Sequence, residues 1–282
     1  MHPTKLHGAI AATVTPLRDR GRAIDDDGIE RLTAFLSSGH LDGILTCGTT
    51  GEGMLLTPDE RRHVTERFLA ARPQGFLVAV HAGAQTTADT VGLAAHALDS
   101  GADAVAVIAP PYFPLDDDEL FRHLQAAANA CDPLPFYVYE FIGRSGYAIP
   151  VEVILRLRDA VPNLAGLKVS DTPFDAVRPY LVGGMDVFIG SEPLVLEGLR
   201  GGAVGAVSGL ASVWPQIVAD LVHHRDAAAH TRVVELRDVL AGLPFHAALK
   251  QALVHASVLL RGDVRAPLRG LTDAERAAVA GL

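Results

Sequence analysis

A lysine at the end of an apolar segment is the residue of this sequence that most directly suggests chemistry. Lys168 follows the apolar run 164–167, which has the length and composition of a short buried strand. The chain holds three lysines among its 24 lysines and arginines, and a lysine is rarely buried without a partner. An amine can lose its proton and attack a carbonyl, whereas a guanidinium cannot. The pattern therefore predicts Schiff-base chemistry, with a buried ion pair to Glu140 or Asp171 as the alternative.

Further polar residues follow other apolar segments. The turn Gly48-Thr49-Thr50-Gly51-Glu52 offers backbone N–H groups and two hydroxyls, which suit a carboxylate or phosphate oxygen. Its alternative role is to cap residues 54–56. Tyr139 is expected to move protons beside Lys168 or to be a core aromatic with its hydroxyl at the rim. Arg144 lies in a glycine-rich loop, where its guanidinium suits a substrate carboxylate or a surface ion pair.

These residues need a scaffold that brings strand ends together. Eight apolar segments alternate with eight segments of helical period over residues 1–224. The expected strands are Gly8–Val14, Gly43–Thr46, Phe76–Val80, Ala104–Ile108, Pro135–Tyr139, Leu164–Val169, Val187–Gly190 and Ala203–Val207. The expected helices are Gly28–Ser38, Pro58–Ala71, Thr87–Ser100, Asp116–Ala130, Val151–Ala160, Phe174–Leu181, Glu192–Arg200 and Val213–His223. The alternation predicts an α/β fold, a (β/α)₈ TIM barrel with active residues at the carboxyl ends of its strands; a doubly wound open sheet is the alternative.

Residues 225–282 are predicted to form a C-terminal helical extension packed on the barrel as one structural unit. Its expected helices are Arg232–Ala241, Pro244–Leu260 and Thr272–Ala280. Local signals support the helix boundaries in the barrel. Thr57-Pro58-Asp59-Glu60 has the pattern of a capping box with proline at the first helical position. Gly39 and Gly101 are expected to end helices with a positive φ.

Composition excludes several classes of function. The net charge of −9 argues against a nucleic-acid partner. Two cysteines suggest a reducing compartment rather than a disulfide scaffold. Residues 1–8 lack the apolar core of a signal peptide, and no apolar stretch reaches the ~18 residues that span a bilayer, so a cytoplasmic protein is expected. The scattered histidines lack zinc-ligand spacing, and no dinucleotide fingerprint is present, so neither metal nor cofactor is predicted.

At these strand ends the chain resembles the dihydrodipicolinate synthase / N-acetylneuraminate lyase family of class I aldolases, over nearly its whole length. The motifs that carry the resemblance are Gly48-Thr49-Thr50-Gly51-Glu52, Tyr139 followed by Gly143-Arg144-Ser145-Gly146, and Gly166-Leu167-Lys168. Each motif alone has low specificity, but their order and spacing together are specific. The resemblance implies a barrel enzyme that joins pyruvate to an aldehyde or releases it.

The resemblance also implies roles for individual residues. Lys168 would form a Schiff base with pyruvate, and Tyr139 would act as the acid and base. Thr49 and Thr50, in the turn that begins at Gly48, would hold the pyruvate carboxylate with their backbone amides. Thr49 and Tyr112 would complete a proton relay, with Tyr112 reaching into the site of a neighbouring subunit. The match therefore implies a homodimer or homotetramer. Gly190 and Val207 fall where the family lines its site with backbone.

The aldehyde partner is less well determined. Arg144 matches the synthase branch, where it would bind the carboxylate of aspartate semialdehyde, and the lead prediction is a 4-hydroxy-tetrahydrodipicolinate synthase-like reaction. Four departures from that branch are Glu140-Phe141-Ile142, Val169, His81 and Ala211-Ser212. Glu140 is expected to place a negative charge near the aldehyde pocket. The alternatives are a 2-keto-3-deoxy sugar acid aldolase or dehydratase, an N-acetylneuraminate lyase-like enzyme, or a non-catalytic barrel that binds a keto acid.

Overall fold

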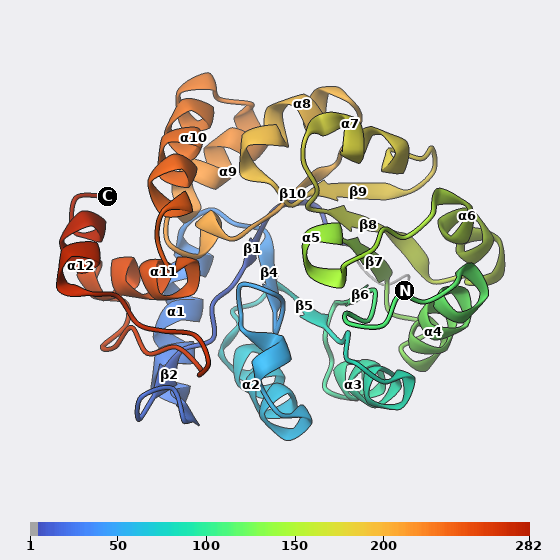
Figure 1. The fold of residues 1–282 in the computed structure, drawn as a ribbon, viewed down its shortest axis with the longest axis horizontal. Helices are drawn as coiled ribbons and strands as arrows, with labels where there is room; N and C mark the ends of the chain where they lie inside the picture. Colours follow the sequence, from blue (N-terminus) through green and yellow to red (C-terminus); the bar gives the residue numbers. More distant parts are fainter. Residues whose placement is uncertain (1–4) are drawn as a thin grey trace.

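Eight parallel strands form a closed barrel in the computed structural model, which describes residues 5–282 (Figure 1). Each strand pairs with its neighbours along the chain, and the first pairs with the last, so the open-sheet alternative is wrong. The barrel strands are β1 Gly8–Ala12, β4 Gly43–Thr46, β5 Leu77–His81, β6 Ala104–Ile108, β7 Phe136–Glu140, β8 Leu164–Val169, β9 Asp186–Ile189 and β10 Gly205–Ser208. The predicted barrel is confirmed.

The barrel interior is filled by small and aromatic side chains below the strand ends. Alternate residues of each strand point inward, and this inner layer includes Ala79, Ala104 and Ala106. Two larger inner residues, Tyr137 and Phe188, pack edge to face with ring centroids 5.7 Å apart. The other strand residues face outward and pack against the surrounding helices. The interior is thus a packed core, and open space is left only at the rim.

Helices surround the barrel, and most begin at the caps that the sequence indicates. They are α1 Asp26–Ser38, α2 Pro58–Ala71, α3 Thr87–Asp99, α4 Asp117–Ala130, α6 Val151–Ala160, α7 Phe174–Val177, α8 Val195–Arg200 and α9 Pro215–His224. The Thr57–Glu60 capping box is present at the start of α2. Gly101 has the expected positive φ of 79°, but Gly39 has a φ of −90°. Gly39 instead provides room, because a Cβ there would lie 2.5 Å from Pro215.

Several short elements between these helices are not predicted by the periodicity of the sequence. A hairpin of β2 Leu17–Arg18 and β3 Ala23–Ile24 precedes α1. A single helical turn, α5 Ile142–Ser145, follows β7. Short 3₁₀ turns, η1 Gly53–Leu55, η2 Arg178–Tyr180, η3 Glu192–Leu194 and η4 Leu210–Ser212, interrupt other loops. Elements of two to four residues are too short to show a period of their own.

The C-terminal segment forms the expected helices, α10 Ala227–Ala241, α11 Phe245–His255 and α12 Asp273–Val279. They lie together on one side of the barrel rim, and α10 contacts α9 (Figure 1). None of the helices in the described range is long and apolar enough to cross a bilayer. The signal-peptide prediction concerns residues 1–8, of which 1–4 lie outside the described range.

Candidate active site

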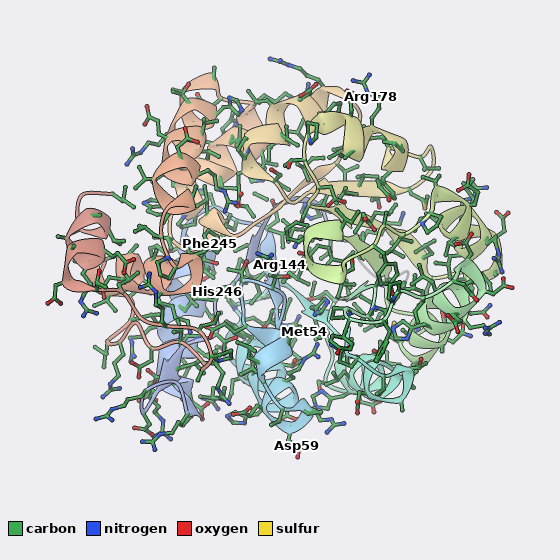
Figure 2. All side chains as sticks on the ribbon, in the orientation of Figure 1. Met54, Asp59, Arg144, Arg178, Phe245 and His246 are labelled. Carbon is green, nitrogen blue, oxygen red and sulfur yellow. The ribbon has the colours of Figure 1, made fainter. Side chains whose placement is uncertain are left out.

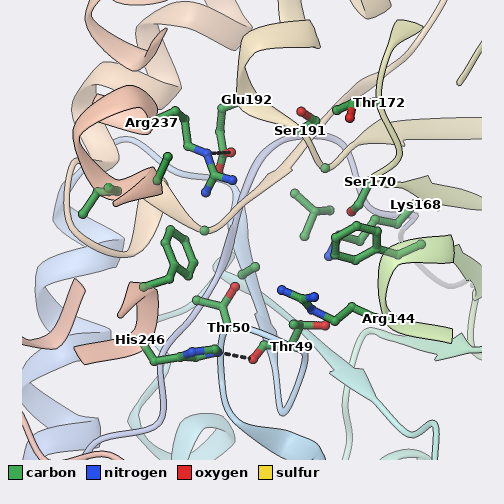
Figure 3. Close-up of a pocket in the computed structure, with 18 of the residues that line it drawn as sticks. Thr49, Thr50, Arg144, Lys168, Ser170, Thr172, Ser191, Glu192, Arg237 and His246 are labelled. Atoms are coloured by element: carbon green, nitrogen blue, oxygen red, sulfur yellow. Dashed lines mark hydrogen bonds and ion pairs between the residues drawn. The ribbon is translucent and has the colours of Figure 1, made fainter. Parts of the chain in front are cut away.

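A pocket of about 350 Å³ opens at the carboxyl ends of the strands, between the barrel and the helical extension (Figure 3). Arg144, Phe245 and His246 lie around its mouth near the centre of the molecule, whereas Asp59 and Arg178 lie at the periphery (Figure 2). Its walls include the predicted residues Thr49, Thr50, Tyr139, Arg144, Lys168, Gly190 and Val207. In the described part of the chain, no three His, Cys, Asp or Glu side chains lie together in a way that could hold a metal ion.

Lys168 reaches the pocket floor from the inner face of β8. The residue is 6% exposed, and its Nζ lies 3.8 Å from the centroid of the Tyr139 ring. Within residues 5–282 it forms no ion pair, so the alternative of a salt bridge to Glu140 or Asp171 is wrong. Gly190 on the neighbouring strand end keeps the space open, because a Cβ there would lie 3.2 Å from the Lys168 Cε. The amine therefore faces an aromatic ring and the cavity.

Tyr139 and Thr49 form a hydroxyl pair beside this amine. Tyr139 is almost fully buried on β7, directly opposite Lys168 in the strand register. Its hydroxyl lies 3.2 Å from the Thr49 Oγ1, at hydrogen-bonding distance. The edge of the His81 ring packs against the Tyr139 ring, with centroids 5.9 Å apart. Two hydroxyls in contact beside an amine can pass a proton between them.

The turn after β4 is held by hydrogen bonds of its own backbone and by the helical extension. The amide of Gly53 donates to the carbonyl of Gly48, at 3.1 Å. His246 of α11 donates through Nε2 to the carbonyl of Thr49, at 2.9 Å (Figure 3). Thr50 lines the pocket, whereas Gly48 lies within the turn and not on the pocket wall. No side chain caps the short helix η1, so the capping alternative for the threonines is wrong.

Arg144 lies on the rim of the pocket, in α5. Its guanidinium carbon is 5.2 Å from the centroid of the Phe141 ring, and Phe141 lines the same wall. It forms no ion pair with any residue of the described range. The alternative of a surface ion pair is therefore wrong for Arg144, and most of its donors are free for a ligand.

The opposite wall comes from residues that the sequence did not single out as functional. Arg237 of α10 approaches Glu192 of η3, with 3.6 Å between Nε and Oε2, and stacks 4.9 Å from the Phe245 ring centroid. Glu192 is buried and accepts hydrogen bonds from the Ser208 hydroxyl and the Leu210 amide, at 2.8 and 3.1 Å. Ser170, Thr172 and Ser191 add hydroxyls to the pocket wall. Arg237 lies in the second α-helix after β10, so no local signal in the sequence links it to Lys168.

Glu140 does not place a negative charge in the pocket, contrary to the sequence-based expectation. Its side chain is 1% exposed and lies on the outer side of β7, because Tyr139 takes the inner side. Glu140 Oε2 accepts a hydrogen bond from the amide of Ile149, at 2.9 Å. Burial, followed by the interaction with Asp171, raises the pKa of Glu140 to about 8. The group is therefore mostly neutral at pH 7.

His81 and Cys47 are buried next to the site without facing the cavity around Lys168. Burial, with the positive charges of Arg61 and Lys168, holds the pKa of His81 well below its ordinary value. The neutral ring donates from Nδ1 to the carbonyl of Cys47, at 3.2 Å. Burial raises the pKa of the Cys47 thiol, as expected for a small packing residue.

Tyr112 does not join the other predicted site residues within its own chain. It is 83% exposed after β6, has a φ of 85°, and packs edge to face on Phe113, which is 69% exposed. Neither ring lines the pocket around Lys168. Two adjacent aromatic side chains exposed in this way form a small apolar surface.

Comparison with known proteins identifies the family and supports the fold. The family described as the dihydrodipicolinate synthetase family matches residues 5–282. An uncharacterized DapA-like lyase of Halobacterium salinarum is 33% identical over 98% of this chain and 93% of its own length. The N-acetylneuraminate lyase of Gallus gallus is 36% identical over 72% of this chain and 68% of its own length. The crystal structure of dihydrodipicolinate synthase from Aquifex aeolicus superposes with a TM-score of 0.92 and 25% identity, over 98% of this chain and 96% of that one.

Members of this family are class I carbon–carbon lyases and synthases, and a synthase of the family has the same barrel. The match spans every residue of the pocket around Lys168. The chain therefore belongs to the dihydrodipicolinate synthetase family of pyruvate-dependent class I aldolases.

Proposed function

We propose that this chain joins pyruvate to an aldehyde, or releases pyruvate from the adduct, through an imine on Lys168. The observation that carries the proposal is the contact of the Lys168 amine with Tyr139, whose hydroxyl meets Thr49 at the pocket floor. The amine attacks the keto carbon of pyruvate, and the carbinolamine loses water when Tyr139 donates a proton to the departing hydroxyl. The imine then withdraws electrons, so the pyruvate methyl gives a proton to the Tyr139 phenolate left by that step and becomes a nucleophilic enamine.

The enamine carbon attacks the aldehyde carbon, and the new alkoxide takes a proton from Tyr139. Water then adds to the imine and returns the free amine of Lys168. The pyruvate carboxylate has a matching position at Thr50 and at the backbone amides of the turn after β4. Gly190 and Val207 line the adjoining wall, where the absence of a side chain at residue 190 leaves space above Lys168.

Arg144 supports aspartate semialdehyde as the aldehyde, because its free guanidinium is suited to a carboxylate. The product would be that of a 4-hydroxy-tetrahydrodipicolinate synthase, the name of a relative from Chlorobium phaeovibrioides. A second candidate is a hydroxylated sugar acid. Ser170, Thr172 and Ser191, with the buried Glu192, make one pocket wall rich in hydrogen-bonding groups, and the chicken relative is a lyase.

We further propose that the chain works as a homodimer or homotetramer in which Tyr112 meets the pocket of a neighbouring subunit. The support is the exposed Tyr112–Phe113 pair, which its own chain leaves uncovered. Tyr112→Ala should shift the protein towards smaller species in sedimentation velocity and slow turnover. An unchanged sedimentation profile with unchanged turnover would remove this proposal.

Borohydride reduction tests the imine. Protein treated with pyruvate and borohydride should carry one covalent adduct, which peptide mass spectrometry places on Lys168. Lys5 and Lys250 are internal controls, because Lys5 is exposed beside Asp186 and Lys250 is buried against Glu52. An adduct on either control lysine, or none at all, contradicts the proposal. An adduct without turnover of any aldehyde would instead favour the non-catalytic keto-acid-binding barrel.

A panel of aldehydes tests the second substrate in both the condensation and cleavage directions. Arg144→Ala should raise the KM for aspartate semialdehyde and leave the KM for pyruvate unchanged. Arg178→Ala is the matched control, because Arg178 stacks on Phe174 in the same way but lies at the periphery (Figure 2). Equal effects of the two substitutions, or none, would reject aspartate semialdehyde and favour the hydroxylated acid.

A further inference from the structure

Two buried carboxyl groups hold both ends of the segment that carries the aldehyde-facing wall. This segment, residues 141–149, contains Phe141 and Arg144. At its start, the amide of Ile142 donates to Asp171 Oδ1, at 2.9 Å. At its end, the amide of Ile149 donates to Glu140 Oε2, also at 2.9 Å. The residue preceding α5 provides no side-chain cap, so Asp171 serves the first turn from a different loop.

The two carboxyl groups lie next to each other. Glu140 ends β7 and Asp171 follows β8, and these strands pair, with the Ser170 amide donating to the Glu140 carbonyl at 3.0 Å. Glu140 is 1% exposed and Asp171 is 5% exposed. Glu140 Oε1 is buried without a hydrogen-bond partner in the described part of the chain. In residues 5–282 neither group forms an ion pair with a basic side chain.

Two carboxylates in contact and away from water cannot both be ionised without a large cost. Burial, then the charge of Asp171 and a hydrogen bond with it, raises the pKa of Glu140 to about 8. A proton on Glu140 Oε1 supplies the partner that this buried atom otherwise lacks. Glu140 therefore keeps its proton at neutral pH.

The two phenols that face this segment remain uncharged in the same range of pH. Tyr180 of η2 donates to the Ile149 carbonyl at 2.8 Å, and Tyr147 donates to the Pro110 carbonyl at 3.0 Å. Burial raises the pKa of both phenols, and Glu140 adds to that rise. Glu119 of α4 acts on Tyr147 as a further negative charge. The proton shared by Glu140 and Asp171 is thus the one lost first as the pH rises.

We propose that Glu140 and Asp171 are positioning residues: by sharing one proton they hold segment 141–149 over the pocket, and loss of that proton releases the segment. Release moves Phe141 and Arg144 from the aldehyde wall. It leaves Lys168 and Thr49 in place, because those residues lie on barrel strand ends and the turn after β4. Binding of the aldehyde should therefore weaken as the pH rises to about 8, while imine formation with pyruvate persists. This last consequence rests on the proposed function; the release of the segment does not.

Hydrogen exchange measured by mass spectrometry tests the release without any substrate. After correction for the intrinsic pH dependence, amide protection in peptides covering residues 141–149 should fall by up to about tenfold per pH unit between about pH 5 and pH 8 and then level off. In Glu140→Gln the amide oxygen still accepts from Ile149 and its NH₂ donates to Asp171, so protection should not depend on pH. Asp171→Asn should give the same result if Glu140→Gln fails to fold. Glu152→Gln, an exposed carboxyl on α6, is the matched control and should behave like the wild type.

The proposal is overturned if wild-type protection is the same at about pH 5 and pH 8, or if Glu140→Gln loses protection as the wild type does. Kinetics with aspartate semialdehyde provide the second readout. Its KM should rise between about pH 5 and pH 8 in the wild type and stay constant in Glu140→Gln, with the KM for pyruvate constant in both. Absence of a borohydride adduct would end the imine proposal and leave the exchange result standing. An adduct together with pH-independent exchange would contradict only the proposed release of segment 141–149.

Discussion

A buried ion pair joins the turn after β4 to the helical extension, and its removal gives the sharpest test of how the site is held. Lys250 of α11 and Glu52 are both almost fully buried, and Lys250 Nζ lies 2.5 Å from Glu52 Oε1. The ammonium also donates to the Asp263 carbonyl at 2.7 Å, and the Arg265 amide donates to Glu52 Oε2 at 2.6 Å. Burial lowers the pKa of Lys250, and the charge of Glu52 opposes that change.

Glu52→Gln removes the negative charge and leaves a buried ammonium. Breaking one partner of a buried pair costs about 3–5 kcal/mol. The amide oxygen keeps one acceptor for Lys250 or Arg265, so we expect the lower end, about 3 kcal/mol. For a chain of 282 residues this corresponds to a fall in Tm of about 5 °C. Glu52→Gln combined with Lys250→Met removes both charges and should recover most of that loss.

Thermal and urea unfolding of the two single variants and the double variant measure this coupling. Glu60→Gln is the matched control, because Glu60 pairs with Arg265 nearby but both side chains are partly exposed, at 24% and 17%. That control should cost no more than about 1 kcal/mol. Additive effects of the two buried substitutions would refute the reasoning. The same pair predicts that residues 1–224 alone will not fold stably, because truncation removes Lys250, the buried partner of Glu52.

Three other outcomes follow from the site and the barrel. Tyr139→Phe should lower kcat by about 10²–10⁴-fold at an unchanged Tm, because it removes only the hydroxyl that meets Thr49; a smaller loss in steady-state assays would exclude Tyr139 as the proton donor. Glu140 has a raised folded-state pKa, so its contribution to stability is fully present when the pH is below the ordinary pKa of the carboxyl group, and it is lost as the pH rises to about 8. In urea unfolding at pH 5, 6.5 and 8, the free energy of unfolding of Glu140→Gln relative to that of the wild type should therefore rise by up to about 1.4 kcal/mol per pH unit. A difference that does not change with pH would contradict this. Gly166→Ala should reduce expression of folded protein, because its Cβ would lie 1.8 Å from the Asp186 carbonyl oxygen; an unchanged Tm would show that β8 and β9 can separate there.

The strand order and the position of Lys168 were predictable because they depend on local patterns. Continuous apolar runs alternate with helical segments, and a parallel barrel is the arrangement that buries such runs on both faces. The capping box at Thr57 was equally local. Gly39 was an exception, because its small size serves a contact with Pro215 that lies far away in the sequence.

The composition of the pocket was only partly predictable. Thr49, Tyr139 and Lys168 end barrel strands or follow them directly, so the fold alone brings them together. Arg237 and His246 belong to helices of the extension, and their side chains meet the pocket only after those helices pack on the rim. Nothing in the local sequence of α10 or α11 distinguishes these residues from other polar residues on a helix surface.

The sequence by itself determined a lysine near the carboxyl end of a barrel strand, since residue type, strand period and motif spacing are all properties of the chain. Only the tertiary structure decided which way the neighbouring side chains face. Alternation along β7 sends Tyr139 inward and Glu140 outward, and the pairing of β7 with β8 brings Glu140 against Asp171. A charge expected in the pocket thereby becomes a buried, proton-sharing group behind it, because the ionisation of a carboxyl depends on its three-dimensional surroundings rather than on its place in the chain.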